Sequence, residues 1–306
     1  MQCGEGLAET KPGAFPLAMT LITADHLNAT IATDGLSVQR AVRYGPAAMD
    51  IWRPRTATAG LPVVVFFYGG AWQRGRRQDY PFVAATLARR GLVVAVPDYR
   101  LYPQVRFPTF IEDAAQAVAA ARRHAPAWGG DPDRVFVAGH SAGAYLAAML
   151  ALDPRYLAAS GEDRAHLAGM VGLAGPYDFL PIQDDDIRAV FASAADLRET
   201  QPVGHVDGRN PPMLLLHGGA DRTCLPRNSL ALAARVREAG GVAEARLYPG
   251  VGHIGIVLGF APVLRFCSPA LADLGGFVLG AGGGSKEGQG SALDPPRAER
   301  PLEPMT

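Results

Sequence analysis

The pentapeptide Gly139-His140-Ser141-Ala142-Gly143 is the strongest chemical signal in this 306-residue chain. It follows the apolar run 134–138 and opens an alanine-rich stretch, 142–152. We therefore expect it to form a sharp turn from a strand into a helix, where flanking glycines avoid side-chain clashes. Such a turn exposes the serine hydroxyl at a helix N-terminus, which favours a developing negative charge. Taken alone, the pattern also fits a Ser-Gly turn that merely starts a helix.

A serine nucleophile needs a base and an acid that orients the base. His253 lies in the glycine-flanked loop 251–255, after the last predicted strand, and Asp221 directly follows the apolar run 213–216 and its short loop. The chain order Ser, Asp, His is the one that accompanies this turn. Each residue has a simpler interpretation, a loop histidine and a helix N-cap, but together they predict a catalytic triad. Three other acids compete with Asp221 without directly following a strand: Asp178, Asp196 and Asp207.

The stretch 67–72, Phe-Tyr-Gly-Gly-Ala-Trp, follows the first predicted parallel strand. Its glycines allow backbone N–H groups to approach a substrate oxygen closely, so Gly69 and Gly70 together with Ala142 are the predicted oxyanion hole. An ordinary turn from a strand into a helix would use the same two glycines.

Short apolar runs alternate with helical segments from residue 61 onward, which is typical of a parallel sheet covered on both faces. We predict strands at 62–67, 92–96, 134–138, 170–174, 213–216 and 243–248. The intervening predicted helices are 80–90, 109–124, 142–152, 227–239 and 269–279. Alternating segments at 38–44 and 48–52, separated by Gly45-Pro46, predict an antiparallel hairpin at the edge of the sheet. The fold class is therefore α/β, with one doubly wound, mostly parallel sheet.

The pattern divides the chain into a tail and cap-associated segment, 1–35, a catalytic domain, 36–279, and a Gly/Pro-rich tail, 280–306. A short helix is expected within 15–31. The connection 176–210 is too long for a simple crossover and is interpreted as a small cap. Its triplet Asp184-Asp185-Asp186 suggests either a metal site or a solvated helix start, and the helix start is the more common case.

The 29 basic and 29 acidic residues balance, which gives no field for nucleic acid or an anionic membrane and favours a small, largely neutral substrate. Cys3, Cys224 and Cys267 form no C-x-x-C pair, so neither a disulfide framework nor a zinc site is indicated. No cofactor or metal is expected. We see no secretory signal and no membrane-spanning run, so a cytoplasmic location is the working hypothesis. The sequence does not indicate an oligomeric state.

These motifs resemble those of α/β-hydrolase-fold carboxylesterases of the hormone-sensitive-lipase-like and feruloyl/acetyl-esterase-like kind, near the kynurenine formamidase-like esterases. The resemblance covers about residues 36–279 and includes the stretches 97–101, 129–134, 139–143 and 252–253. It implies that Ser141 is the nucleophile, that Asp221 and His253 complete the triad, and that Gly69, Gly70 and Ala142 form the oxyanion hole. The family's oxyanion loop usually begins His-Gly-Gly, whereas this chain has Tyr68 at the first position.

We therefore predict a metal-independent serine hydrolase of short-chain or aryl carboxylic esters. The alternatives are an arylformamidase-type amidase and a hydrolase-fold protein that only binds its ligand. The residues expected to contact the substrate are aromatic: Tyr68, Trp72, Tyr177 and Phe179, with Phe191 as a further pocket residue. Arg74, Arg76 and Arg77 could hold a substrate carboxylate, although solvated loop arginines are more common. His140 is expected not to be a second base, and Cys224 to be an inert thiol near the site.

Overall fold

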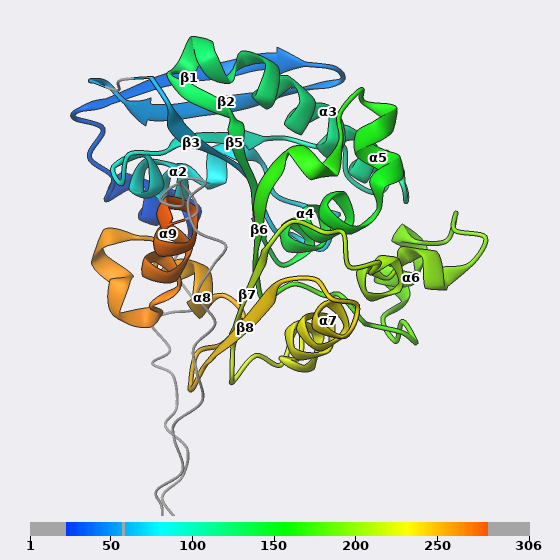
Figure 1. The fold of residues 1–306 in the computed structure, drawn as a ribbon. Helices are drawn as coiled ribbons and strands as arrows, with labels where there is room; N and C mark the ends of the chain where they lie inside the picture. Colours follow the sequence, from blue (N-terminus) through cyan, green and yellow to red (C-terminus); the bar gives the residue numbers. More distant parts are fainter. Residues whose placement is uncertain (1–22, 57–58, 281–306) are drawn as a thin grey trace, which may run out of the picture.

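The computed structural model describes residues 23–56 and 59–280. Within this part of the chain, eight strands form one sheet in the order β1-β2-β4-β3-β5-β6-β7-β8. Every neighbouring pair from β4 to β8 is parallel, whereas β2 is antiparallel to both β1 and β4 (Figure 1). The predicted mostly parallel α/β architecture with antiparallel N-terminal strands is confirmed.

The strands are β1 (Leu36–Tyr44), β2 (Ala47–Pro54), β3 (Leu61–Phe67), β4 (Val93–Pro97), β5 (Gly130–His140), β6 (Leu167–Leu173), β7 (Met213–Gly218) and β8 (Ala243–Tyr248). The helices are α1 (Ala24–Ala29), α2 (Pro81–Ala88), α3 (Thr109–His124), α4 (Ala142–Leu152), α5 (Pro154–Ala159), α6 (Asp185–Val190), α7 (Arg227–Glu238), α8 (Gly255–Leu258) and α9 (Ala270–Gly280).

Helices cover both faces of the sheet (Figure 1). Helices α3, α4 and α7 pack on one face, and α2 and α9 pack on the other. Strands β3 and β4 are therefore buried along almost their whole length, which explains why they read as continuous apolar runs instead of alternating ones. Every residue of α4 is buried, so its alanine-rich composition reflects close packing on all sides.

The carboxyl ends of the parallel strands meet at one edge of the sheet. The loops after β3, β5, β7 and β8 hold Gly69, Ser141, Asp221 and His253, respectively. In a parallel α/β sheet this edge is where ligands bind, because loops from separate strands converge there. The sheet therefore brings together four segments that are far apart in the sequence.

Some elements differ from the sequence-based expectation. Helices α5 and α8 were not predicted, and β5 begins at Gly130. Asp184 caps α6 by accepting the Ile187 N–H at 3.1 Å, so the acidic triplet starts a helix. The predicted helix within 15–31 appears only as α1, because residues 1–22 lie outside the described part, as does the predicted tail beyond residue 280. None of the described helices combines the length and the apolar character needed to cross a bilayer.

Candidate active site

Ser141 occupies a strained turn between β5 and α4. Its φ is 55° and its ψ is −120°, a conformation that non-glycine residues rarely adopt. The turn is possible because of the glycines on either side. A Cβ on Gly139 would lie 2.3 Å from the Gly143 carbonyl, and a Cβ on Gly143 would lie 2.0 Å from the Phe67 carbonyl oxygen. The Ser141 N–H donates to the carbonyl oxygen of Leu173 at 2.9 Å, which fixes the turn against β6.

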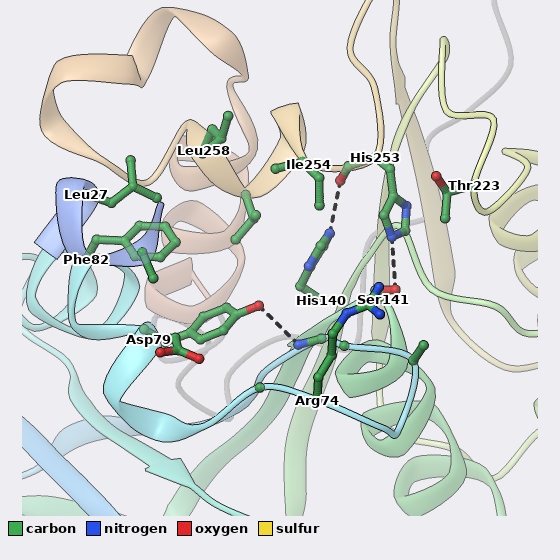
Figure 2. Close-up of a pocket in the computed structure, with 17 residues that line it drawn as sticks. Leu27, Arg74, Asp79, Phe82, His140, Ser141, Thr223, His253, Ile254 and Leu258 are labelled. Carbon is green, nitrogen blue, oxygen red and sulfur yellow. Dashed lines mark hydrogen bonds between the residues drawn. The ribbon is translucent and has the colours of Figure 1, made fainter. Parts of the chain in front are cut away.

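Ser141, His253 and Asp221 form a continuous hydrogen-bonded chain. His253 Nε2 lies 2.9 Å from Ser141 Oγ, and His253 Nδ1 lies 2.7 Å from Asp221 Oδ2 (Figure 2 shows the Ser141 contact). Because a carboxylate can only accept, Nδ1 carries the proton, which leaves the Nε2 lone pair to accept the serine hydroxyl. This is the tautomer that a general base needs.

Asp221 is held as a charged acceptor. Its Oδ1 accepts the N–H groups of Thr223 and Cys224, both at 2.9 Å, and buried His217 lies 3.3 Å from its Oδ2. Burial raises the pKa of Asp221, but the hydrogen bonds from His217, His253 and Cys224 outweigh burial and hold that pKa well below its usual value. Sequence reasoning missed His217, although its place four residues before Asp221 was a signal.

His140 supports the histidine loop instead of acting as a second base. Its Nε2 donates to the carbonyl of His253 at 3.0 Å (Figure 2), and within the described part of the chain its Nδ1 has no partner. Burial, followed by the nearby His253 ring, lowers the pKa of His140 to about 3. The ring is therefore neutral and fixed at neutral pH.

The loop after β3 faces Ser141. The N–H of Gly69, a predicted oxyanion donor, donates to the hydroxyl of Tyr80 at 3.2 Å and is therefore engaged. The N–H groups of Gly70 and Ala71 donate to no backbone acceptor in the part of the chain that the structure describes. Ala142 begins α4, and its N–H has no acceptor within the helix. Gly70, Ala71 and Ala142 are therefore the candidate oxyanion donors, and Ala71 was not predicted.

Tyr68, at the position where the family usually has histidine, packs behind this loop and supports it. It is 1% exposed and stacks on Tyr99 with ring centroids 4.6 Å apart. The Tyr99 hydroxyl donates to the Tyr68 carbonyl at 2.8 Å, and the Tyr99 N–H donates to the Tyr68 hydroxyl at 3.4 Å. Tyr68 lines neither of the cavities at Ser141, which differs from its predicted contact with substrate.

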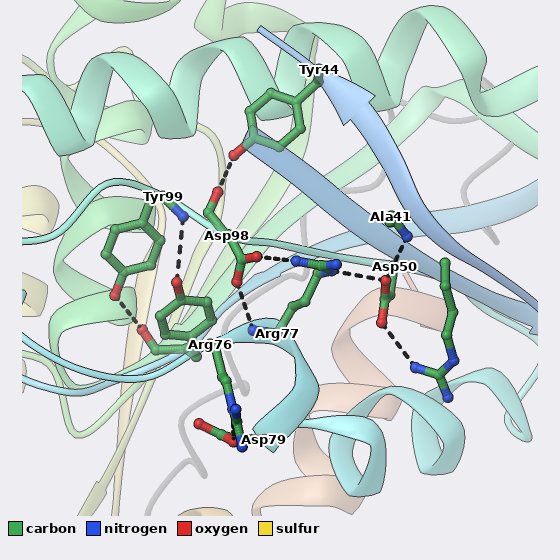
Figure 3. Close-up of polar contacts among 10 residues, drawn as sticks. Ala41, Tyr44, Asp50, Arg76, Arg77, Asp79, Asp98 and Tyr99 are labelled. Carbon is green, nitrogen blue, oxygen red and sulfur yellow. Dashed lines mark hydrogen bonds and ion pairs between the residues drawn. The ribbon is translucent and has the colours of Figure 1, made fainter. Parts of the chain in front are cut away.

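A partly buried ion-pair network fixes the far end of the same loop (Figure 3). Arg77 bridges Asp50 on β2, at 2.9 Å, and Asp98, which follows β4. Asp98 also accepts the Arg77 N–H at 2.7 Å, and its carbonyl accepts the Tyr44 hydroxyl. Asp50 further accepts the Ala41 N–H at 2.9 Å. The loop is thus tied to both antiparallel and parallel strands.

Two cavities meet at Ser141, one of about 620 Å³ and one of about 440 Å³. The larger cavity is walled by apolar side chains of α1, α2 and α8, including Leu27, Phe82 and Leu258 (Figure 2). The smaller cavity is walled by residues of the loop 71–72 and the segment 176–187, including Trp72 and Phe179. Four residues line both cavities: Ala71, Arg74, Ser141 and Thr223. A substrate spanning both cavities would present its middle to Ser141.

Two predicted pocket residues lie elsewhere. Tyr177 is fully buried and fills the space left by two glycines, since a Cβ on Gly172 would lie 1.9 Å from its hydroxyl. Phe191 is fully buried in an aromatic cluster, 4.9 Å from Trp72 between ring centroids. Both stabilise the wall of the smaller cavity from behind and line neither cavity.

The competing acids, the cysteine near the site and the possible metal ligands can also be located in the structure. Asp196 pairs with Arg198 and Asp207 pairs with Arg164, so two of the three competing acids are engaged away from His253. Cys224 lines the smaller cavity, and burial, with Asp221 nearby, raises the pKa of its thiol, which disfavours a reactive thiolate. Within residues 23–56 and 59–280, no group of three or more His, Cys, Asp or Glu side chains is arranged to hold a metal ion.

The fold and the geometry at Ser141 define a protein of the α/β-hydrolase fold. A thermostable carboxylesterase from a metagenomic library, EstE1, has the same fold with a TM-score of 0.70 and 22% identity, over 83% of this chain and 94% of that one. A truncated carbohydrate esterase from gut microbiota gives a TM-score of 0.69 with 20% identity, over 82% of this chain and 98% of that one.

Within that fold, the chain belongs to the BD-FAE family, whose model matches residues 49–236. A probable isoprenylcysteine alpha-carbonyl methylesterase of Arabidopsis thaliana, ICMEL1, is 30% identical over 72% of this chain and 52% of its own length. Esterase LipC of Mycobacterium tuberculosis is 34% identical over 70% of this chain and 59% of its own length. The chain thus spans little more than half of these relatives. The predicted resemblance to carboxylesterases is confirmed.

The Arg77 bridge generates a stability prediction. We expect Arg77→Met to lower the free energy of unfolding by about 2–4 kcal/mol, because it leaves Asp98 without a cation and buried Asp50 with only the exposed Arg40. Urea denaturation measures this loss. The matched control is Arg76→Met, whose pair with Asp79 is 65% exposed on the arginine side, and which should leave stability essentially unchanged. Equal effects of the two substitutions would contradict the assigned role of Arg77.

The lowered pKa of His140 generates a pH prediction. Between pH 6.5 and about 4 the unfolded chain binds a proton at this histidine whereas the folded chain does not. The contribution of His140 to stability is therefore lost as the pH falls, by about 1.4 kcal/mol per pH unit. In His140→Gln, whose amide can still donate to His253, the pH dependence of urea denaturation should be correspondingly shallower over this range. An unchanged slope would show that His140 titrates normally.

Proposed function

We propose that this protein is a serine hydrolase that cleaves carboxylic esters through an acyl-enzyme. The observation that carries the proposal is the chain of contacts from Ser141 Oγ to His253 Nε2, at 2.9 Å, and from His253 Nδ1 to Asp221, at 2.7 Å. Esterase relatives and the family match support the same reaction class. Because the chain spans only part of those relatives, we do not assign their substrates to this protein.

In the proposed mechanism, His253 takes the proton of Ser141 as the serine oxygen attacks the acyl carbonyl. Asp221 keeps the imidazole in the correct tautomer and stabilises its positive charge. The N–H groups of Gly70, Ala71 and Ala142 receive the oxyanion of the tetrahedral intermediate. His253 then protonates the leaving alcohol, and a water molecule activated by the same histidine releases the acid from Ser141.

We expect short-chain and aryl esters to be the preferred substrates. Trp72 and Phe179 offer aromatic surface in the smaller cavity, whereas Tyr68 and Tyr177 contribute through the loop and wall that they support. Charged side chains stand in each cavity, Asp79 in the larger and Asp184 in the smaller. A long acyl tail would have to desolvate them, which is unfavourable. Free thiols at Cys224 and Cys267 fit the proposed cytoplasmic location.

The nucleophile can be tested with p-nitrophenyl acetate. The wild-type protein should release a burst of one p-nitrophenol per protein, followed by steady turnover. In Ser141→Ala the burst should vanish and kcat/KM should fall by about 10³-fold or more, because the attacking atom is gone. The far-ultraviolet circular dichroism spectrum and Tm control for folding. More than about a tenth of the activity left in this variant would remove Ser141 from the proposed role.

The acyl preference can be tested with p-nitrophenyl esters from acetate to palmitate. We expect the highest kcat/KM between acetate and hexanoate, because a longer acyl chain would have to desolvate the charged residues in the cavities. A maximum at decanoate or longer would contradict this expectation. N-formyl anilines belong in the same panel, since turnover of these above that of every ester would favour the arylformamidase alternative. An absence of turnover with all of them would favour the ligand-binding alternative.

A further inference from the structure

Arg74 is the charged side chain that lines both cavities beside Ser141, together with the neutral residues Ala71 and Thr223. It is exposed, and Figure 2 shows its side chain extending from the loop toward the Ser141–His253 pair. Any ester held with its carbonyl at Ser141 must therefore place one of its two parts near this guanidinium. The position of Arg74 makes it a candidate for reading the charge of the substrate.

The two neighbouring arginines are neutralised, whereas Arg74 is not. Arg76 pairs with Asp79 at 2.9 Å, and Arg77 pairs with Asp50 and Asp98. Within residues 23–56 and 59–280, no carboxylate lies within ion-pair distance of Arg74. The nearest acidic groups of the cavities have other partners: Asp79 binds Arg76, and Asp184 caps α6. An anionic group arriving from solvent would thus meet an unpaired guanidinium at Arg74. Arg227, for which the described residues also provide no ion pair, lines only the smaller cavity.

The turn that carries Arg74 is held by backbone hydrogen bonds and by packing. The N–H groups of Gln73 and Arg74 both donate to the Gly70 carbonyl, at 3.0 and 3.1 Å. Gly70 has a φ of 134°, and a Cβ there would lie 2.0 Å from the Arg74 carbonyl oxygen. The buried Trp72 ring anchors the same turn against Tyr145, at 5.1 Å between ring centroids. Because the turn is fixed, less conformational entropy is lost when Arg74 holds a ligand.

We propose that Arg74 selects esters whose acyl or alcohol part carries a carboxylate. The proposal rests on the ester hydrolase function proposed above and adds a substrate class to it. A planar guanidinium can donate two parallel hydrogen bonds to a carboxylate, which an uncharged isostere cannot match. Since Arg74 stays in contact with solvent, the preference should be moderate and should weaken as the salt concentration rises.

The test uses two pairs of esters of equal size that differ only in charge. In one pair the leaving group varies: 3-acetoxybenzoate against 3-acetoxybenzamide. In the other pair the acyl part varies: monoethyl adipate against ethyl 5-carbamoylpentanoate. Hydrolysis is followed by pH-stat titration. We expect the wild-type kcat/KM to favour the carboxylate about tenfold over the carboxamide in one of the pairs, which also identifies the part of the ester that lies near Arg74.

The variants assign the preference to one side chain. Arg74→Gln should bring the ratio of carboxylate to carboxamide to about one, and Arg74→Lys should keep part of it, because an ammonium retains charge without the bidentate geometry. The matched control is the double variant Arg76→Gln/Asp79→Asn, which removes both members of the neighbouring ion pair without changing the local net charge and should keep the wild-type ratio. Raising the salt concentration to about 0.5 M should reduce the ratio in the wild type and leave it unchanged in Arg74→Gln.

The outcomes separate this proposal from the one on which it rests. Hydrolysis of the neutral esters without a carboxylate preference in either pair would overturn the role of Arg74 and leave the esterase function intact. An unchanged preference in Arg74→Gln, or its loss in the double variant Arg76→Gln/Asp79→Asn, would also overturn it. Failure of the wild-type protein to hydrolyse any ester would overturn both proposals together.

Discussion

The close approach of two backbone segments underlies the whole site. The start of α4 lies so near the end of β3 that any side chain at Gly143 would collide with the Phe67 carbonyl, 2.0 Å from the first added carbon. This contact forces the strained turn at Ser141 and at the same time sets the distance between Ser141 and the loop after β3. The nucleophile and the candidate oxyanion donors are therefore positioned by one contact. Hydrogen bonds that stabilise a transition state require such fixed placement, because donors that must first reorient add the free energy of that reorganisation to the activation barrier.

The loop after β3 has positive φ angles at Ala71 and Trp72, a costly conformation for residues with a Cβ. Three independent attachments offset that cost. Trp72 packs in the aromatic cluster, Tyr68 stacks on Tyr99, and Arg77 binds two carboxylates. Tyr68 thus supports the loop through its ring and through its carbonyl. A tyrosine can therefore replace the usual histidine at this position, because its side chain packs behind the loop and outside the cavities.

The sequence was sufficient to predict what depends on chain order and on strand ends. The parallel sheet follows from apolar runs, and Ser141, Asp221 and His253 converge because each follows a strand. It was insufficient where the outcome depends on distances between segments. Whether Gly69 or Ala71 keeps a free N–H is decided by the hydroxyl of Tyr80, eleven residues further along the chain. Tyr177 was expected in the pocket because it is aromatic and lies in a long connection, but the absent side chains of Gly172 and Gly175 give it a buried place.

Charge gives the clearest case of the difference between composition and structure. The 29 basic and 29 acidic residues cancel, and this balance suggested a largely neutral substrate. The positive and negative charges do not cancel at every place on the surface, however, because some charged side chains form ion pairs and others do not. Of the three arginines at 74, 76 and 77, two are paired with carboxylates and one faces both cavities at Ser141. Since exposed charges are screened over about 8–10 Å at physiological salt, the field at the serine depends on the side chains that line the two cavities, Arg74 among them, and not on the net charge of the chain.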